Sequence, residues 1–149
     1  MSKSEKLVAL TRSVRAAFNR LRALGDALHS DLEVTTAMRA VMETLSASGA
    51  MTVPQIAKLK SVTRQHIQLL ADALCAAGLA AVRENPAHRR SSLIALTEKG
   101  KRAFAKMQAR ETPVIEALAD DFDVQELERA TSVLNRLVAR LDERVKETV

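Results

Sequence analysis

The sequence is poor in the residues from which small compact sites are built. Its 149 residues include one cysteine, four glycines, three phenylalanines, no tryptophan and no tyrosine. One cysteine excludes an intramolecular disulfide and a four-thiolate metal site within the chain. Four scattered glycines exclude a glycine-rich loop that cradles phosphates. The shortage of aromatic rings disfavours an aromatic cage and a surface on which single-stranded bases stack.

Long apolar runs are missing as well. The longest run, residues 73–82, contains Gly78 and is too short to span a bilayer. The polar first residues do not lead into the apolar core of a signal peptide. We therefore expect a cytoplasmic protein that makes no membrane contact.

The chain has the composition of one globular domain with a real core: 47% apolar and 28% charged residues. Its net charge of +5 is unevenly spread. Lysine and arginine exceed aspartate and glutamate in residues 52–90, whereas the acidic residues are in excess in residues 113–149. A basic middle favours a polyanionic partner there.

Both ends of the chain show the periodicity of long amphipathic helices. Apolar residues recur every three, four or seven positions from Leu7 to Leu28 and every three or four positions from Leu127 to Val145. Each stripe must be covered by another chain, by the other terminal helix or by the chain's own core, and the pattern leaves these alternatives open.

The middle of the chain is divided more finely. One short helix is expected from residue 35 to 47, and Thr52 can cap a second one that ends at Lys60. Thr63 can cap a third helix, which runs to Ala77 and stops at the following glycine. Two capped helices joined by a turn of about three residues predict a helix-turn-helix, the unit that delivers a helix to the DNA major groove.

The third of these helices leaves hydrogen-bonding side chains on its outer face. Arginine can donate two bonds to guanine, glutamine can pair with adenine, and leucine can touch a thymine methyl group. Thr63 and the backbone amides of the helix N-terminus can donate hydrogen bonds to a phosphate group. The alternative is an ordinary solvated face. The residues at or near the outer face are Arg64, Gln65, His66, Gln68 and Leu69.

A basic hairpin is expected directly after this helix. Residues 79–83 and 92–96 favour two strands around a turn-rich tip at residues 85–88. A positive hairpin fits a minor groove or a row of phosphates, although arginines can also simply keep an edge hairpin soluble. A further helix begins at Thr97, and Pro113 predicts a kink or break in it. The arginines of the hairpin are Arg83, Arg89 and Arg90.

The order of these motifs resembles the MarR (multiple antibiotic resistance regulator) family of transcription factors. The resemblance covers nearly the whole chain, and the hairpin followed by Leu-Thr-x-x-Gly is its most specific part. The segments that carry it are residues 52–59, 62–68, 74–79, 85–90 and 93–100.

The resemblance implies a mainly α fold with a small β-hairpin wing. Residues 35–112 would form the winged helix-turn-helix, with residues 1–34 and 113–149 as helical dimerisation regions. It implies a homodimer that binds a palindromic operator in double-stranded DNA, more often as a repressor, and that a small-molecule effector can release. Recognition helix 63–77 would enter the major groove, and Arg90 of wing 79–96 the minor groove.

One position departs from the family pattern. His88 stands where members usually carry an acid that orients the wing arginine. Either Glu84 replaces this acid from the opposing strand or the wing is looser. For the DNA backbone we expect contacts from Lys58 or Lys60 and from Arg89.

The sequence also bears on three alternative functions. No nucleophile and base pair and no metal-binding spacing is present, so we expect neither an enzyme nor a cofactor. A protein-interaction adaptor on the same fold is possible because folds do not fix function. Redox sensing through Cys75 is the third reading, but its helical phase favours a partly buried packing residue.

Overall fold

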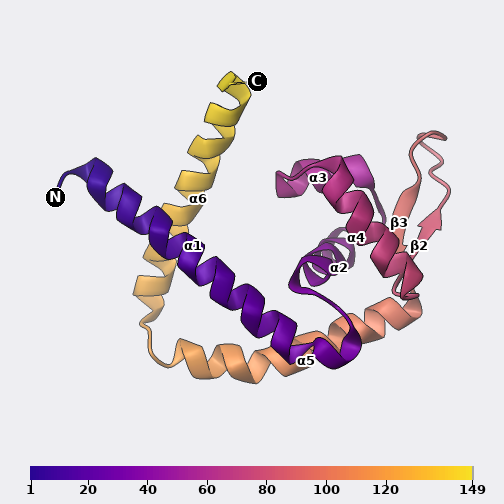
Figure 1. The fold of residues 1–149 in the computed structure, drawn as a ribbon, viewed down its shortest axis with the longest axis horizontal. Coiled ribbons are helices and arrows are strands. Elements are labelled where there is room, and N and C mark those ends of the chain that lie inside the picture. The colour runs from indigo at the N-terminus through magenta and orange to yellow at the C-terminus, as the bar shows by residue number, and fades with distance from the viewer. Residues whose placement is uncertain (149) are drawn as a thin grey trace. The chain divides into compact units, whose positions relative to one another are not determined.

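The computed structural model describes residues 1–148, which form helices and one small three-stranded sheet (Figure 1). The mainly α fold with a β-hairpin wing is therefore confirmed. The elements are α1 (Lys3–Leu28), the 3₁₀ turn η1 (Ser30–Leu32), α2 (Thr36–Ser48), β1 (Met51–Thr52), α3 (Val53–Lys60), α4 (Arg64–Ala76), β2 (Ala80–Arg83), β3 (Leu93–Leu96), α5 (Glu98–Ala119) and α6 (Val124–Thr148).

The chain divides into two units, Met1–Arg110 and Glu111–Val149, with the boundary inside α5. Helices α1 to α4, the sheet and the first half of α5 belong to the first unit, and the end of α5 and all of α6 to the second. The assignment of residues 1–34 and 113–149 to dimerisation stays a prediction.

Side-chain caps begin the helices where the sequence predicts them. Thr52 and Gln55 form a reciprocal capping box at α3, in which Gln55 N donates to Thr52 Oγ1 and Thr52 N donates to Gln55 Oε1. Thr63 accepts a hydrogen bond from the amide of His66 at the start of α4. Because these caps satisfy amides that would otherwise lack partners, α3 and α4 begin at defined residues.

The sheet is antiparallel, in the order β1-β3-β2. The hairpin β2-β3 was predicted, but the two-residue strand β1 was not. Met51 pairs with Ile94 and Thr52 with Leu93. Two residues directly before a capping box carry no alternation that could reveal a strand. The third strand ties the wing to the start of α3.

One apolar core lies between α2, α3, α4, the sheet and the first half of α5. Helix α4 buries Ile67, Ala71 and Leu74, and Leu70 is half-buried beside them, as the periodicity predicts. This burial turns the opposite face of α4 to solvent. The other members of the buried cluster are Val34, Met38, Val41, Met42, Leu45, Ile56, Ala57, Leu79, Ala80, Ile94, Leu96, Phe104 and Met107.

Glycine is required where α5 crosses the start of β2. A Cβ atom built on Gly100 would overlap the backbone carbonyl of Leu79. A backbone carbonyl cannot rotate away as a flexible side chain can. Gly100 therefore lets the first turn of α5 approach the sheet closely, and this contact positions the helix that follows the wing.

Of the kink or break expected at Pro113, the break is not found. Helix α5 continues through this proline to Ala119. A proline removes one amide donor and crowds the preceding turn. After Val114 and Ile115, the four residues from Glu116 to Ala119 have high helix propensity and continue the helix beyond the proline.

Candidate DNA interface

A three-residue turn joins α3 to α4. Ser61 adopts the left-handed backbone conformation with φ 52°, and its amide donates to the Lys58 carbonyl. The next amide, of Val62, donates to the Ala57 carbonyl at 3.1 Å. The two helices therefore meet as a helix-turn-helix, with the buried face of α4 on the core and its other face outside.

The outer face of α4 carries the predicted side chains. All of them are exposed, and Leu69 is an apolar residue with 64% of its surface in solvent. These five residues are Arg64, Gln65, His66, Gln68 and Leu69.

A hollow of about 500 Å³ lies between α4 and the wing. Arg64, Gln65 and Gln68 contribute from the helix, and Arg90 from the wing. Four side chains predicted from separate motifs thus meet on one surface. The remaining lining residues are Val53, Pro54, Val82, Ser91, Ser92 and Ile94.

Two neighbouring hollows bring in further basic residues. Lys58 and Arg64 line a hollow of about 410 Å³ at the helix-turn-helix. Arg83 and Arg89 line another, of about 830 Å³, along the wing. His66 and Leu69 line none of these three hollows, although both lie on the outer face of α4.

Two of the residues predicted to contact the DNA backbone form hydrogen bonds within the protein. The half-buried Lys60 points to α2, where its Nζ donates to the Ala40 carbonyl at 3.4 Å. The Thr63 hydroxyl caps α4. Of the two lysines considered, Lys58 is the exposed one, so the geometry favours Lys58 for a phosphate contact.

Asn85 orders the tip of the wing, a role that was not predicted. Its Nδ2 donates to the Ser91 carbonyl at 3.0 Å, and its Oδ1 accepts from the Ala87 amide at 3.1 Å. The His88 amide also donates to the Asn85 carbonyl. Asparagine directly before a proline is a turn signal, so the position could have been singled out for this role.

Glu84 does not replace the acid that the family pattern places at the tip. Within residues 1–148, neither a hydrogen bond nor an ion pair joins Glu84 to Arg83, Arg89 or Arg90. The backbone of the tip is held by Asn85 instead, and the three exposed guanidinium groups keep their donors available.

An unpredicted hydrogen bond lies on the outer face of α4. Gln68 Nε2 donates to Asp72 Oδ1 at 2.8 Å. The two residues are one helical turn apart, which is the spacing at which helix side chains meet. This bond orients one of the amides that line the hollow.

The C-terminal end of α4 is attached to the first turn of α5. Thr97 Oγ1 donates to the Gly78 carbonyl at 2.6 Å and accepts from the Gly100 amide. Lys99 Nζ donates to the Ala77 carbonyl at 2.8 Å. A cation at a helix C-terminus is favourable because the helix dipole is negative there. These bonds fix the recognition helix to the helix that follows the wing.

Cys75 is half-buried beside the core. Burial, with a smaller contribution from the Asp72 carboxylate, raises the pKa of the Cys75 thiol. A thiol held in its protonated form is a poor nucleophile, so its surroundings do not favour the redox-sensing alternative.

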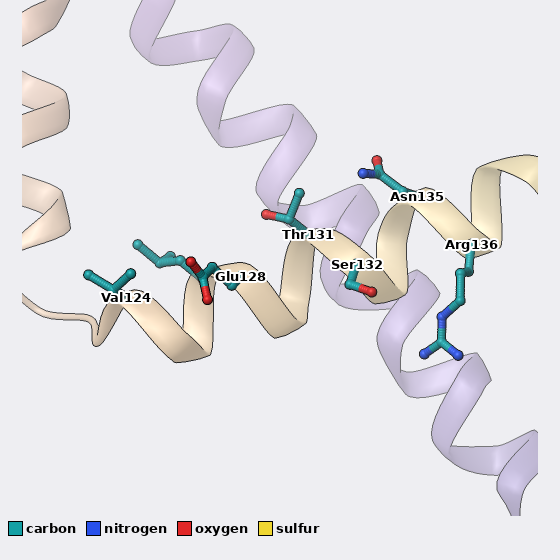
Figure 2. Close-up of a pocket in the computed structure, with 7 residues that line it drawn as sticks. Val124, Glu128, Thr131, Ser132, Asn135 and Arg136 are labelled. Carbon is teal, nitrogen blue, oxygen red and sulfur yellow. The ribbon is translucent and has the colours of Figure 1, made fainter.

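A further hollow, of about 600 Å³, runs along α6 (Figure 2). None of the residues predicted to contact DNA lines it. In the part of the chain that the structure describes, no cluster of three potential metal ligands occurs, and no helix is long and apolar enough to cross a membrane. The lining residues are Val124, Leu127, Glu128, Thr131, Ser132, Asn135 and Arg136.

Comparison with curated proteins finds relatives of nearly the same length. The uncharacterized proteins Rv2011c of Mycobacterium tuberculosis and Mb2034c of Mycobacterium bovis are each 34% identical over 138 residues, 93% of this chain and 96% of the relative. No family model matches the sequence.

Solved structures share the fold over almost the whole chain. A MarR family transcription regulator is 26% identical with a TM-score of 0.82, covering 97% of this chain and 96% of its own. BldR of Sulfolobus solfataricus, a transcriptional regulator, is 18% identical with a TM-score of 0.82, covering 94% and 99%. A mutant MarR of E. coli complexed with operator DNA is 19% identical with a TM-score of 0.79, covering 92% and 99%.

The helix-turn-helix followed by a basic wing defines the class as a winged-helix DNA-binding protein. The strong structural matches support a MarR-family winged-helix regulator. The resemblance recognised in the sequence is confirmed.

Proposed function

We propose that the protein is a homodimeric repressor that binds a palindromic operator through α4 and the wing. The observation that carries this proposal is the hollow shared by Arg64, Gln65, Gln68 and Arg90. It joins hydrogen-bonding side chains suited to base edges with a guanidinium group suited to a narrow minor groove. The function that we propose is not enzymatic.

The side chains divide by the part of DNA they would contact. Arg64 pairs with a guanine, and Gln65, His66 and Gln68 read neighbouring bases from the same helix face. Leu69 contacts a thymine methyl group, and Arg90 enters the minor groove. Phosphates are contacted by the α4 N-terminus at Thr63 and by the cationic side chains of Lys58, Arg83 and Arg89.

The apolar residues left exposed on α1 and α6 support a dimer. Phe18 on α1 is 61% exposed, and Val145 on α6 is 62% exposed. Contiguous exposed apolar faces of this kind mark interaction surfaces, and a second copy of the chain would cover both. The other exposed large apolar residues on these helices are Leu7, Val8, Val14, Leu21, Leu24, Val124, Leu127, Val133, Leu134, Val138 and Leu141.

Dimerisation and operator recognition belong to one proposal. A two-fold dimer presents two copies of α4, which suits half-sites about one helical turn, roughly 34–36 Å, apart. The E. coli MarR structure complexed with operator DNA supports binding to an operator. Release of the DNA by a small-molecule effector stays a prediction from the family resemblance.

Selection of bound sequences from a random duplex pool at physiological salt tests the proposal. We expect an inverted repeat, bound by a dimer as measured by sedimentation in the presence and absence of DNA. Salt at this level suppresses part of the uniform phosphate attraction, so base preference is visible. Weak binding without sequence preference would favour the adaptor alternative. A particle that stays monomeric with and without duplex would overturn the proposal.

A further inference from the structure

The side-chain amide of Gln68 is held in one orientation by Asp72. Gln68 Nε2 donates to Asp72 Oδ1 at 2.8 Å, and both residues are exposed on the outer face of α4. The opposite orientation would bring the amide oxygen against a carboxylate that has only acceptors, and two acceptors repel. Asp72 therefore selects one of the two amide orientations before any DNA is bound.

This orientation determines which groups Gln68 presents to a ligand. One amide hydrogen is used by Asp72, which leaves the amide oxygen as an acceptor and the second hydrogen as a donor. Adenine presents a matching donor and acceptor in the major groove, at N6 and N7. Guanine presents two acceptors there, O6 and N7, and O6 would face the amide oxygen.

We propose that Asp72 is a specificity-determining positioning residue, which makes Gln68 select adenine against guanine. The inference rests on the proposed function, because it requires that α4 lies in the major groove. Asp72 itself is not assigned a contact with the base. Without it, the Gln68 amide can turn its two hydrogens toward the base and accept guanine as well.

Gln65 provides a comparison within the same helix. It lines the same hollow as Gln68, but within residues 1–148 no hydrogen bond to its side chain is found. A change at Asp72 should therefore leave the base preference set by Gln65 unaltered. This separates the orienting effect from the general effect of removing a negative charge near DNA, which strengthens binding to all sequences alike.

The test is to select sequences with the wild-type protein and with three variants. Gln68→Ala identifies the operator position that Gln68 reads. At that position we expect wild type to prefer adenine over guanine by about tenfold or more, and Asp72→Ala to prefer it by about twofold or less. Asp72→Glu can still accept from Gln68 one turn away and should retain the adenine preference. Fluorescence anisotropy titrations on duplexes that differ only at that position give the ratio of the affinity for adenine to the affinity for guanine.

Folding is checked separately. Position 72 is an exposed helix site and alanine has the highest helix propensity, so the circular dichroism melting curve of Asp72→Ala should match wild type. The inference is overturned if Asp72→Ala keeps the wild-type ratio of adenine to guanine binding, or if Gln68→Ala changes no position. Failure of the wild-type protein to select any sequence is a different result, because it rejects the proposed function as a whole.

Discussion

Arg110 Nη1 and Nη2 contact the two carboxylate oxygens of Asp31 at 2.6 and 2.8 Å, although the residues are 79 positions apart in the chain. The same guanidinium donates to the Leu28 carbonyl at 3.1 Å. Paired hydrogen bonds between arginine and a carboxylate have a fixed geometry. Arg110 thus joins α5 to the segment that follows α1.

The first prediction concerns acid stability. The hydrogen bonds from Arg110 lower the pKa of Asp31 from its usual 3.8 to about 2. A carboxylate with a lowered pKa stabilises the folded state above its unfolded pKa, and this contribution is lost as the pH falls toward 2. Asp31→Asn should therefore lower the thermal midpoint at neutral pH, and the difference from wild type should shrink from pH 4 to pH 2. Differential scanning calorimetry over this range measures it.

Glu33→Gln serves as the control for this experiment, because Glu33 is an exposed acid close to Asp31 in the chain. Glu33→Gln should leave the dependence of the thermal midpoint on pH nearly unchanged. If Asp31→Asn shows the same dependence on acid as wild type, the ion pair does not contribute to stability.

The second prediction concerns Gly100. A Cβ atom there would overlap the backbone carbonyl of Leu79, so the first turn of α5 would have to shift. Overpacking at a tight site costs about 1–3 kcal/mol, and we expect Gly100→Ala to lose stability of this order in urea denaturation. Arg102→Ala, at an exposed position of the same helix, should change the free energy of unfolding by about 0.5 kcal/mol at most. Equal stability of the two variants would refute the close approach.

The third prediction separates base reading from phosphate binding. Arg64→Ala should lose about 1–3 kcal/mol of binding free energy on the selected operator. It should also relax the base preference at one operator position. Lys58→Ala should weaken binding to all duplexes alike and reduce the slope of log affinity against log salt by about one. Filter binding at several salt concentrations measures both. A uniform loss in both variants would contradict the separate roles.

The fourth prediction concerns Cys75. Because burial raises the pKa of its thiol, iodoacetamide should modify Cys75 more slowly than free cysteine at pH 8. Peroxide should leave operator binding unchanged, both in the parent protein and in Cys75→Ser. Loss of binding in the parent alone would restore the redox-sensing alternative.

Local signals predicted most of the fold. Thr52 and Thr63 mark the starts of α3 and α4 because a hydroxyl at the N-cap satisfies free amides of the same helix. The outer face of α4 follows from helical periodicity alone. The prediction of a break at Pro113 was wrong because a proline weakens a helix without always ending it.

Contacts between distant residues could not be predicted. The bond between Arg110 and Asp31 depends on how α5 packs, and no pattern in either segment specifies it. Either Lys58 or Lys60 was expected at the DNA backbone, and the Lys60 side chain reaches the Ala40 carbonyl on α2. Gln68 and Asp72 have the spacing of a helix pair, but this signal is shared by many pairs that do not bond.

The bonds from Thr97 and Lys99 join the residues that end α4 to the start of α5. Because the carbonyls of Ala77 and Gly78 are bonded there, the C-terminal end of α4 has little freedom to move apart from the first turn of α5. If α4 lies in a DNA groove as proposed, its withdrawal would carry the first turn of α5 with it. A tilt of that turn would in the same way move the outer face of α4.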